Sequence, residues 1–464
     1  MTEPSQDTTS WHAHLRASLV LGLPLIGAQL ASVGLGVTDT IMLGWLGAEP
    51  LAASVLGTTF YFLCFLTGAG IAHAVAPIVA NALGAGDDVT VRRSVRMAIW
   101  AVLIFAILCL PLLLNAEPIF LALGQVPELA ALADDYLDIA CWALAMNLFH
   151  TVLRSYLSAF ERAGVVLYAT LLGLGLNAML NYMFIFGNWG APALGIQGAA
   201  VATLGTNTVI TIALIAYVMW LPELRKYTLF VRFWRPDWGA FAEVLALGWP
   251  ISLTLLAEVS LFSLSSVMIG WIGTIELAAH GIALQISSVV FMVPLGLSFV
   301  ATVRVGRAAG RADWLAVHRA SVTVMILATG VALLAAAVLL IFPDALAALF
   351  LDRDNPDFRQ IVSYCGALLA VAALFQVADT LQVVAAGMLR GIKDTRVPMM
   401  IAVASYIGAG IFFAYGLGFW AGLGGVGVWL GLAIGLALAA VLLLWRYVIL
   451  YRRLAGRLGH DMDL

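Results

Sequence analysis

The sequence predicts an all-α integral membrane protein, with twelve transmembrane helices in two six-helix lobes that are related as parallel repeats around a central cleft. Composition, the distribution of basic residues and an internal repeat each support this fold class. Of the 464 residues, 63% are hydrophobic and only 11% are charged, and the mean hydropathy is +1.01. Soluble proteins carry about 25% charged residues, so this composition excludes a soluble globular protein.

Twelve stretches of the chain are long and apolar enough to cross a bilayer, which takes about 20 mainly apolar residues per helix. They lie at 16–37, 51–75, 96–115, 135–157, 164–187, 196–219, 241–269, 277–302, 320–342, 361–388, 397–418 and 426–450. Asp138 and Arg154 fall near the ends of the fourth stretch. The segments between the stretches are too short for a separate soluble domain.

The basic residues give the orientation. Cytoplasmic loops retain Lys and Arg, whereas Asp and Glu hardly affect topology. All of the 23 basic residues except Arg353 and Arg359 stand before the first stretch, after an even-numbered stretch or at the end of the last one. Both termini are therefore predicted to be cytoplasmic, and the basic face can meet anionic lipid headgroups.

The two halves of the chain repeat each other at an offset of 226 residues. Gly22-Leu23-Pro24 corresponds to Gly248-Trp249-Pro250, and the run from Met42 to Gly47 corresponds to the run from Met268 to Gly273. Because each repeat has an even number of helices, both halves start on the same side of the membrane, as in parallel repeats. The predicted domains are an N-lobe at 1–220, a cytoplasmic linker at 221–240 and a C-lobe at 241–464.

Three carboxylates lie inside or at the edge of apolar stretches, namely Asp39, Glu258 and Asp379. An ionised side chain at bilayer depth is costly unless it is paired or hydrated, so such residues are ion or proton sites by default. The repeat does not copy these acids, because Asp39 corresponds to Ser265 and Glu258 to Ser32. Acids that are specific to one lobe indicate functions that are specific to one lobe.

Other motifs exclude several classes of protein. The only lysines, Lys226 and Lys393, do not stand in a G-x-x-x-x-G-K context, and neither G-x-S-x-G nor H-E-x-x-H occurs, so no ATPase or hydrolase is predicted. The four cysteines have no C-x-x-C spacing and are expected as buried thiols. His73 and His150 could carry protons near physiological pH, but an ordinary hydrogen-bonded position is expected for both, and a structural one for His280. The polar segment from Met1 to Ser10 lacks a basic n-region, so we expect it to be retained.

Three groups of motifs resemble a known family. They are Gly22-Leu23-Pro24 with Thr38-Asp39-Thr40, Ala76-Pro77-Ile78-Val79 with Gly84-Ala85-Gly86, and Leu389-Arg390-Gly391-x-Lys393-Asp394-Thr395 with Pro398. Together they resemble the MATE (multidrug and toxic compound extrusion) transporters, in particular the NorM-like subgroup, over essentially the whole chain. The resemblance implies secondary active efflux of organic cations and toxic compounds out of the cell, by antiport against inward Na+ or H+ and alternating access.

By position, the resemblance places a cation-coupling site in the C-lobe at Glu258 and Asp379, where Na+ binding is possible. Gln376, Asp379 and Gln382 are three residues apart and Phe375 is four before Asp379, so all four share one helix face. Oxygen ligands of this kind suit Na+ better than a soft metal. Phe375 replaces a tyrosine that is common at this turn among Na+-coupled members, so both Na+ and H+ stay open.

In the N-lobe, the resemblance implies a polar network around Asp39 that includes Asn177, Asn181 and Thr203. For the two asparagines, hydrogen bonding between helices is an equally good explanation. An alternative function is a flippase or exporter of a lipid-linked or endogenous metabolite. A flippase would need a strongly basic cavity to bind pyrophosphate, whereas the basic residues of this chain lie at loops and span ends.

We expect no enzymatic activity, no cofactor other than the coupling ion, and no nucleic-acid partner. The expected partners are small organic cations and the lipid bilayer, and the expected form is a monomer. The resemblance implies a multi-pass protein of the bacterial plasma (inner) membrane.

Overall fold

A computed structural model describes residues 10–351 and 356–456, and these residues form helices joined by short loops, without strands. The helices are α1 (Trp11–Leu46), α2 (Ala48–His73), α3 (Val75–Ala85), α4 (Asp88–Leu113), α5 (Ala116–Ala122), α6 (Pro127–Ala159), α7 (Ala163–Phe186), η2 (Asn188–Gly190), α8 (Ile196–Trp220), α9 (Pro222–Arg225), α10 (Trp238–Gly270), α11 (Thr274–Gly310), α12 (Trp314–Ile341), α13 (Pro343–Ala348), α14 (Phe358–Gly391), α15 (Arg396–Val403), η3 (Ala404–Gly410), α16 (Ile411–Tyr415), η4 (Gly416–Trp420) and α17 (Gly424–Gly456). The predicted amino-terminal segment up to residue 9, the loop at Arg353 and the terminal Arg457 lie outside the described residues.

The predicted number of membrane spans is confirmed. Within the described residues, twelve helices are long and apolar enough to cross a membrane. Two of them combine several elements, because α2 and α3 form one span from Ala48 to Ala85, and α15 to η4 form one span from Arg396 to Trp420. Elements η3 and η4 are π-helical, a geometry that is rare and often found at functional sites.

The helices extend beyond the predicted apolar stretches. For the first span, 16–37 was predicted, but α1 runs from Trp11 to Leu46 and stops before Gly47, whose φ of 143° favours glycine. Asp39 therefore lies inside a helix and not at its end. Hydropathy detects only the apolar part of such a helix, whereas the helical hydrogen bonds of the backbone continue until a residue breaks them.

The internal repeat is visible in how equivalent helices begin. Asp87 caps α4 by accepting hydrogen bonds from the amides of Val89 and Thr90, and Asp313, 226 residues later, caps α12 by accepting from the amide of Ala316. The Thr90 hydroxyl also donates to Asp87, and these bonds hold the pKa of Asp87 below its ordinary value. Duplicated caps give the two halves the same helix boundaries.

The chain forms two compact units, and the boundaries between their residue ranges fall inside two helices, α1 and α10. Unit 1 consists of residues 1–26 and 253–464, and unit 2 of residues 27–252. The first part of α1 thus belongs to unit 1, and the first part of α10 belongs to unit 2. The predicted division at 1–220, 221–240 and 241–464 is based on the sequence repeat. The compact units are defined by packing contacts, so they do not test that division, and it stays a prediction.

Equivalent glycines hold the exchanged segments. In unit 1, a Cβ on Gly296 of α11 would lie 2.6 Å from the Ile26 side chain of α1. In unit 2, a Cβ on Gly70 of α2 would lie 2.3 Å from the backbone nitrogen of Ser252 in α10, and the Ser252 hydroxyl donates to the Thr67 carbonyl. Gly70 and Gly296 are repeat equivalents, as are Ile26 and Ser252. Each unit thus packs the start of the other half's first helix by the same glycine contact.

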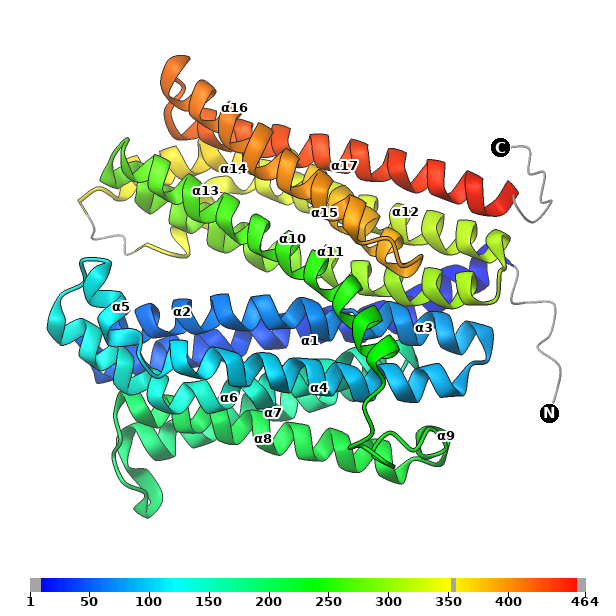
Figure 1. The fold of residues 1–464 in the computed structure, drawn as a ribbon. Coiled ribbons are helices and arrows are strands. Elements are labelled where there is room, and N and C mark those ends of the chain that lie inside the picture. Colours follow the sequence, from blue (N-terminus) through cyan, green and yellow to red (C-terminus); the bar gives the residue numbers. More distant parts are fainter. Residues whose placement is uncertain (1–9, 352–355, 457–464) are drawn as a thin grey trace. The chain divides into compact units, whose positions relative to one another are not determined.

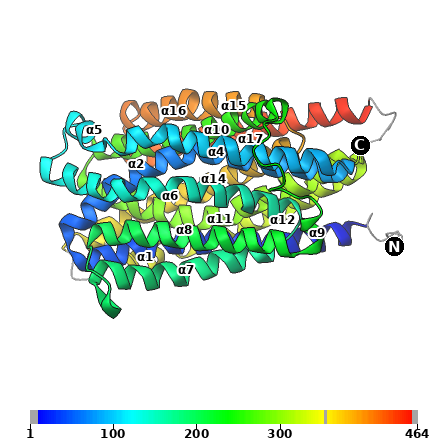
Figure 2. The ribbon, with the colours of Figure 1, turned by 60° about the horizontal axis from the view of Figure 1, so that its bottom comes forward.

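Each unit is built around one central helix. In unit 2, α6 packs against α2, α4 and α8 (Figure 1). In unit 1, α14 packs against α11, α12 and α17 (Figure 2). The central helices α6 and α14 are repeat equivalents. Both carry buried polar residues, such as Thr151 in α6 and Gln376 in α14.

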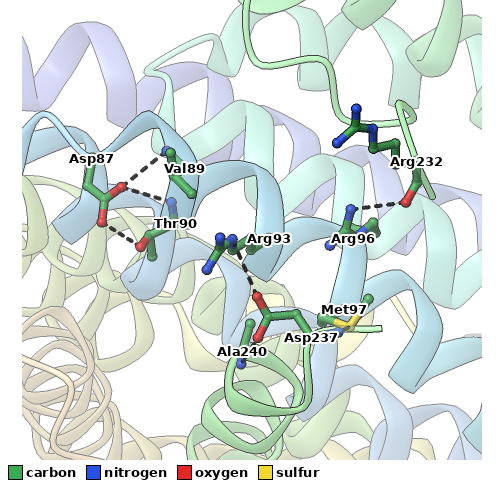
Figure 3. A network of polar contacts seen from close by, with 9 residues as sticks. All are labelled: Asp87, Val89, Thr90, Arg93, Arg96, Met97, Arg232, Asp237 and Ala240. Carbon is green, nitrogen blue, oxygen red and sulfur yellow. Dashed lines mark hydrogen bonds and ion pairs between the residues drawn. The ribbon is translucent and has the colours of Figure 1, made fainter. Parts of the chain in front are cut away.

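The connector between the halves, residues 221–237, is fastened to α4 within unit 2. Arg93 pairs with Asp237 at 3.4 Å, and Arg96 donates to the carbonyl of Arg232 at 3.1 Å (Figure 3). Trp100 donates to the carbonyl of Phe233 at 3.1 Å. These contacts attach the connector along two turns of one helix.

Candidate functional site

The C-lobe acid of the tenth span lies in the middle of α14. Asp379 is 2% exposed, and Gln382, one turn later, donates from Nε2 to its Oδ1 at 3.0 Å. The predicted shared helix face is therefore realised for this pair. A carboxylate buried at this depth requires such donors or a cation.

Tyr406 extends this hydrogen-bond chain from a second helix. Its hydroxyl, on the π-helical segment η3, donates to Oε1 of Gln382 at 2.6 Å. The chain thus runs from Tyr406 through Gln382 to Asp379, and all three side chains are buried. The sequence does not single out Tyr406, because a lone tyrosine in an apolar span carries no signal until the fold places it beside α14.

Gln376 is fully buried, and neither its amide nitrogen nor its amide oxygen has a hydrogen-bonding partner among the described residues. An unpaired buried polar group costs about 1–3 kcal/mol. Gln376 stands one turn before Asp379 and leaves both a donor and an acceptor available beside the carboxylate. Such a group fits a bound ion or water.

Glu258 provides the second acid of this cluster. It lies in the part of α10 that belongs to unit 1, is partly buried and forms no hydrogen bond or ion pair with a described residue. Its charge interacts with those of Asp379 and of Arg390 at the end of α14. The cluster therefore has two carboxylates and one guanidinium that interact electrostatically, and two interacting acids favour a shared proton or a cation.

An aromatic wall lies beside the acids. Phe375 meets Trp429 edge-on with ring centroids 5.5 Å apart, and Phe262 at 5.9 Å. Trp429 donates to Nδ1 of His280 at 3.0 Å, and His280 Nε2 contacts the Ser266 hydroxyl at 3.0 Å. The expected hydrogen-bonded structural position of His280 is thus found, and it holds Trp429 in place against Phe375.

The N-lobe network lies in unit 2. Asn181 of α7 donates from Nδ2 to Asp39 Oδ1 at 2.5 Å and is 3.2 Å from Asn177 Oδ1. Both asparagines are buried. Thr203 of α8 lies close to Asp39, but its hydroxyl completes no hydrogen bond. The four residues that were named together from the sequence therefore lie together in the fold.

The predicted residues form two clusters, one in each unit. Among the described residues, no group of three or more His, Cys, Asp or Glu side chains could hold a metal ion. The unit 1 cluster instead offers two carboxylates with amide and phenol oxygens. This donor set is compatible with Na+, which binds hard oxygen ligands, and with protonation.

The chain is similar to known proteins in sequence and in fold. The family model described as MatE matches residues 24–183 and 250–416. A probable multidrug resistance protein NorM of Rhizobium meliloti is 52% identical over 97% of this chain and 97% of its own length. A second, from Agrobacterium fabrum, is 48% identical over 96% of each chain. A crystal structure of a MATE in complex with MaL6 has a TM-score of 0.86 at 23% identity and covers 96% of this chain and 97% of its own, which shows the fold.

Proposed function

Because this chain belongs to the MATE family of transporters, and is therefore not an enzyme, we propose that it carries out secondary active multidrug efflux, exchanging organic cations for inward Na+ or H+. The names of its relatives support the efflux of drugs. The observation that carries the proposed coupling is the cluster of Glu258, Asp379 and Gln376, where two acids and an unpaired amide stand within membrane-spanning helices.

Charge competition is the proposed coupling mechanism. The anionic carboxylates of Glu258 and Asp379 favour an organic cation when the transporter faces the cytoplasm. Na+ or H+ from outside then neutralises the acids, lowers the affinity for the organic cation and releases it. Such competition is reciprocal, so the drug also lowers the affinity for the ion. The two units would alternate access by moving as bodies.

One ion supplies enough energy. A monovalent cation that moves down about 100 mV releases about 2.3 kcal/mol, which sustains roughly a fifty-fold gradient of a neutral substrate. For Na+, the proposed ligands are oxygens of Glu258, Asp379 and Gln376, since Phe375 has none. For H+, the acid pair is the acceptor.

We assign the N-lobe network of Asp39, Asn177, Asn181 and Thr203 to protonation and substrate binding. Asn181 holds one carboxylate oxygen of Asp39, which leaves the other for a proton or a cationic group. We further propose a monomer in the bacterial inner membrane with both termini in the cytoplasm, as the distribution of arginines predicts.

The test is dye transport in proteoliposomes, started by a Na+ gradient or a pH gradient. We expect one ion to drive exchange of a fluorescent organic cation in the wild type. Glu258→Gln and Asp379→Asn should each reduce ion-driven exchange more than tenfold while the protein still inserts. The control is Glu276→Gln, an acid in the first turn of α11 that lies outside the cluster.

Two outcomes would change the proposal. Wild-type exchange in both variants would remove the coupling role of these acids. A wild-type protein that responds to neither gradient would favour export of a lipid-linked or endogenous metabolite instead.

A further inference from the structure

Arg154 lies inside α6, which continues beyond it for more than a turn to Ala159. Its side chain is partly buried, and its Nη2 atom is fully buried without a hydrogen-bonding partner. No carboxylate of the described residues pairs with it, and its guanidinium donates no hydrogen bond to them. A permanently charged group therefore stands in a membrane-spanning helix without a counter-charge among the residues that the structure describes.

His150 stands one turn before Arg154 on the same face of α6. Its Nε2 atom is also buried without a partner, and its ring forms no hydrogen bond with a described residue. The expectation of an ordinary hydrogen-bonded position is wrong for this histidine. One turn earlier, Asn147 contacts the hydroxyl of Tyr61 at 3.4 Å. Residues spaced by three and four form one stripe, so the polar groups face the same way.

Other arginines near the ends of the spans in unit 2 have a polar partner, although Nε of Arg96 is also buried without one. Arg93 pairs with Asp237, and Arg96 donates to the carbonyl of Arg232 (Figure 3). Arg162, in the turn after α6, pairs with Glu223. The structure describes every residue of unit 2. No residue of this unit therefore remains that could pair with the guanidinium of Arg154.

The chemistry of the two side chains indicates which kind of ligand they could bind. A guanidinium is planar and always charged, and it binds carboxylate or phosphate through two parallel hydrogen bonds. A neutral imidazole can donate a third bond, and a protonated one adds charge. An arginine whose purpose was only structural would gain by pairing inside the protein, since a buried donor without a partner costs about 1–3 kcal/mol.

We propose that Arg154 and His150 form an oxyanion subsite within unit 2, which binds the carboxylate or phosphate of a ligand. This inference rests on the proposed transport function and deepens it, because it names residues that would hold the anionic group of an amphoteric substrate. The oxyanion belongs either to such a substrate or to a phospholipid headgroup that occupies the same place. Both sources use the same contacts, and the experiment separates them.

The test is a binding comparison between two forms of one dye. The probes are an amphoteric xanthene dye with a free carboxylate and the methyl ester of the same dye, which differ by one negative charge. Fluorescence anisotropy measures their affinities for the purified protein in phosphatidylcholine nanodiscs. We expect Arg154→Gln to weaken binding of the carboxylate form about tenfold and to leave the ester unchanged. Arg154→Lys should keep most of the preference.

Arg162→Gln is the matched control, because it removes an arginine from the turn that follows the same helix. It should change neither affinity. If Arg154→Gln weakened both dyes equally, the role of Arg154 would be structural, and if it changed neither, the subsite would not exist. Melting temperatures of all variants show whether the fold is kept. If Arg154→Gln does not fold, the same comparison is made with His150→Ala, which should lose part of the carboxylate preference.

Phosphatidylglycerol separates the two sources. If a lipid headgroup fills the subsite, adding this lipid to the nanodiscs lowers the carboxylate preference of the wild type and raises its melting temperature, and Arg154→Gln abolishes both effects. If the subsite binds substrate alone, the preference is the same in both lipids. Neither the dye affinities nor the melting temperatures depend on an ion gradient. If ion-driven exchange of the ester failed, the proposed antiport would be contradicted, but the binding result for the subsite would still stand.

Discussion

At the scale of single residues, Asp379 depends on a partner that is remote in sequence. Gln382 could be expected beside it, since three residues separate them on one helix. Tyr406 could not, because it reaches Gln382 from a π-helical segment of the next span. A helical period predicts neighbours within a helix but not which residue of another helix completes a hydrogen-bond chain.

Tyr406→Phe tests the importance of that chain. Removing the hydroxyl frees Gln382, which then orients Asp379 less firmly. A typical hydrogen bond contributes about 1 kcal/mol, so we expect about a fivefold rise in the half-saturating concentration of the coupling ion for dye exchange. Tyr415→Phe, at a more exposed position of the same span, should leave that concentration unchanged. An unchanged value in Tyr406→Phe would place the hydroxyl outside the ion site.

The buried arginines differ in a way that the sequence does not reveal. Arg96 and Arg154 both belong to apolar helices, and both were expected at span ends. The fold gives Arg96 a backbone carbonyl from the connector, and it gives Arg154 none. Whether a charge is paired depends on tertiary neighbours, so the sequence alone did not distinguish the two.

At the scale of helices, the number of spans was predictable and their lengths were not. Twelve apolar stretches gave twelve spans. Their ends depend on caps such as Asp87 and on breaks such as Gly47, which hydropathy does not measure. The partners of the glycines that allow close contact between helices likewise became clear only from the fold.

Gly431 of α17 gives a direct test of close packing. A Cβ there would lie 2.1 Å from the backbone nitrogen of Ala414 in α16. Gly431→Ala should force the helices apart and destabilise the protein by about 1–3 kcal/mol, seen as a lower melting temperature in tryptophan fluorescence. Gly330→Ala, in α12, meets no atom within 4 Å and should melt as the wild type or slightly higher. Equal melting of both variants would contradict the close approach of α16 and α17.

At the scale of the whole molecule, the compact units do not coincide with the repeats. The repeat at 226 residues predicts two halves, and the caps confirm their equivalence. The exchange after Ile26 and after Ser252 was not predictable, because a repeat in sequence says nothing about which copy a segment packs against. Packing of α1 on α11 and of α10 on α2 decided it.

Separately expressed halves test this exchange. Residues 1–240 lack most of unit 1, and the segment 241–464 lacks the part of α1 that unit 1 contains. We expect each half alone to be degraded, and co-expression to yield both halves together on a resin that binds a tag on only one. Stable accumulation of either half alone, with a cooperative melting transition, would show that the exchanged segments are dispensable.

The exchange of first helices also bears on ancestry. If the halves descend from one six-helix sequence, as the repeat indicates, that ancestor needed the start of a first helix from another chain to complete its packing. In a dimer of this ancestor, each copy could pack the start of the other copy's first helix. Gene duplication and fusion would then have linked the two subunits of a pre-existing dimer, and the connector at 221–237 would mark the point of fusion.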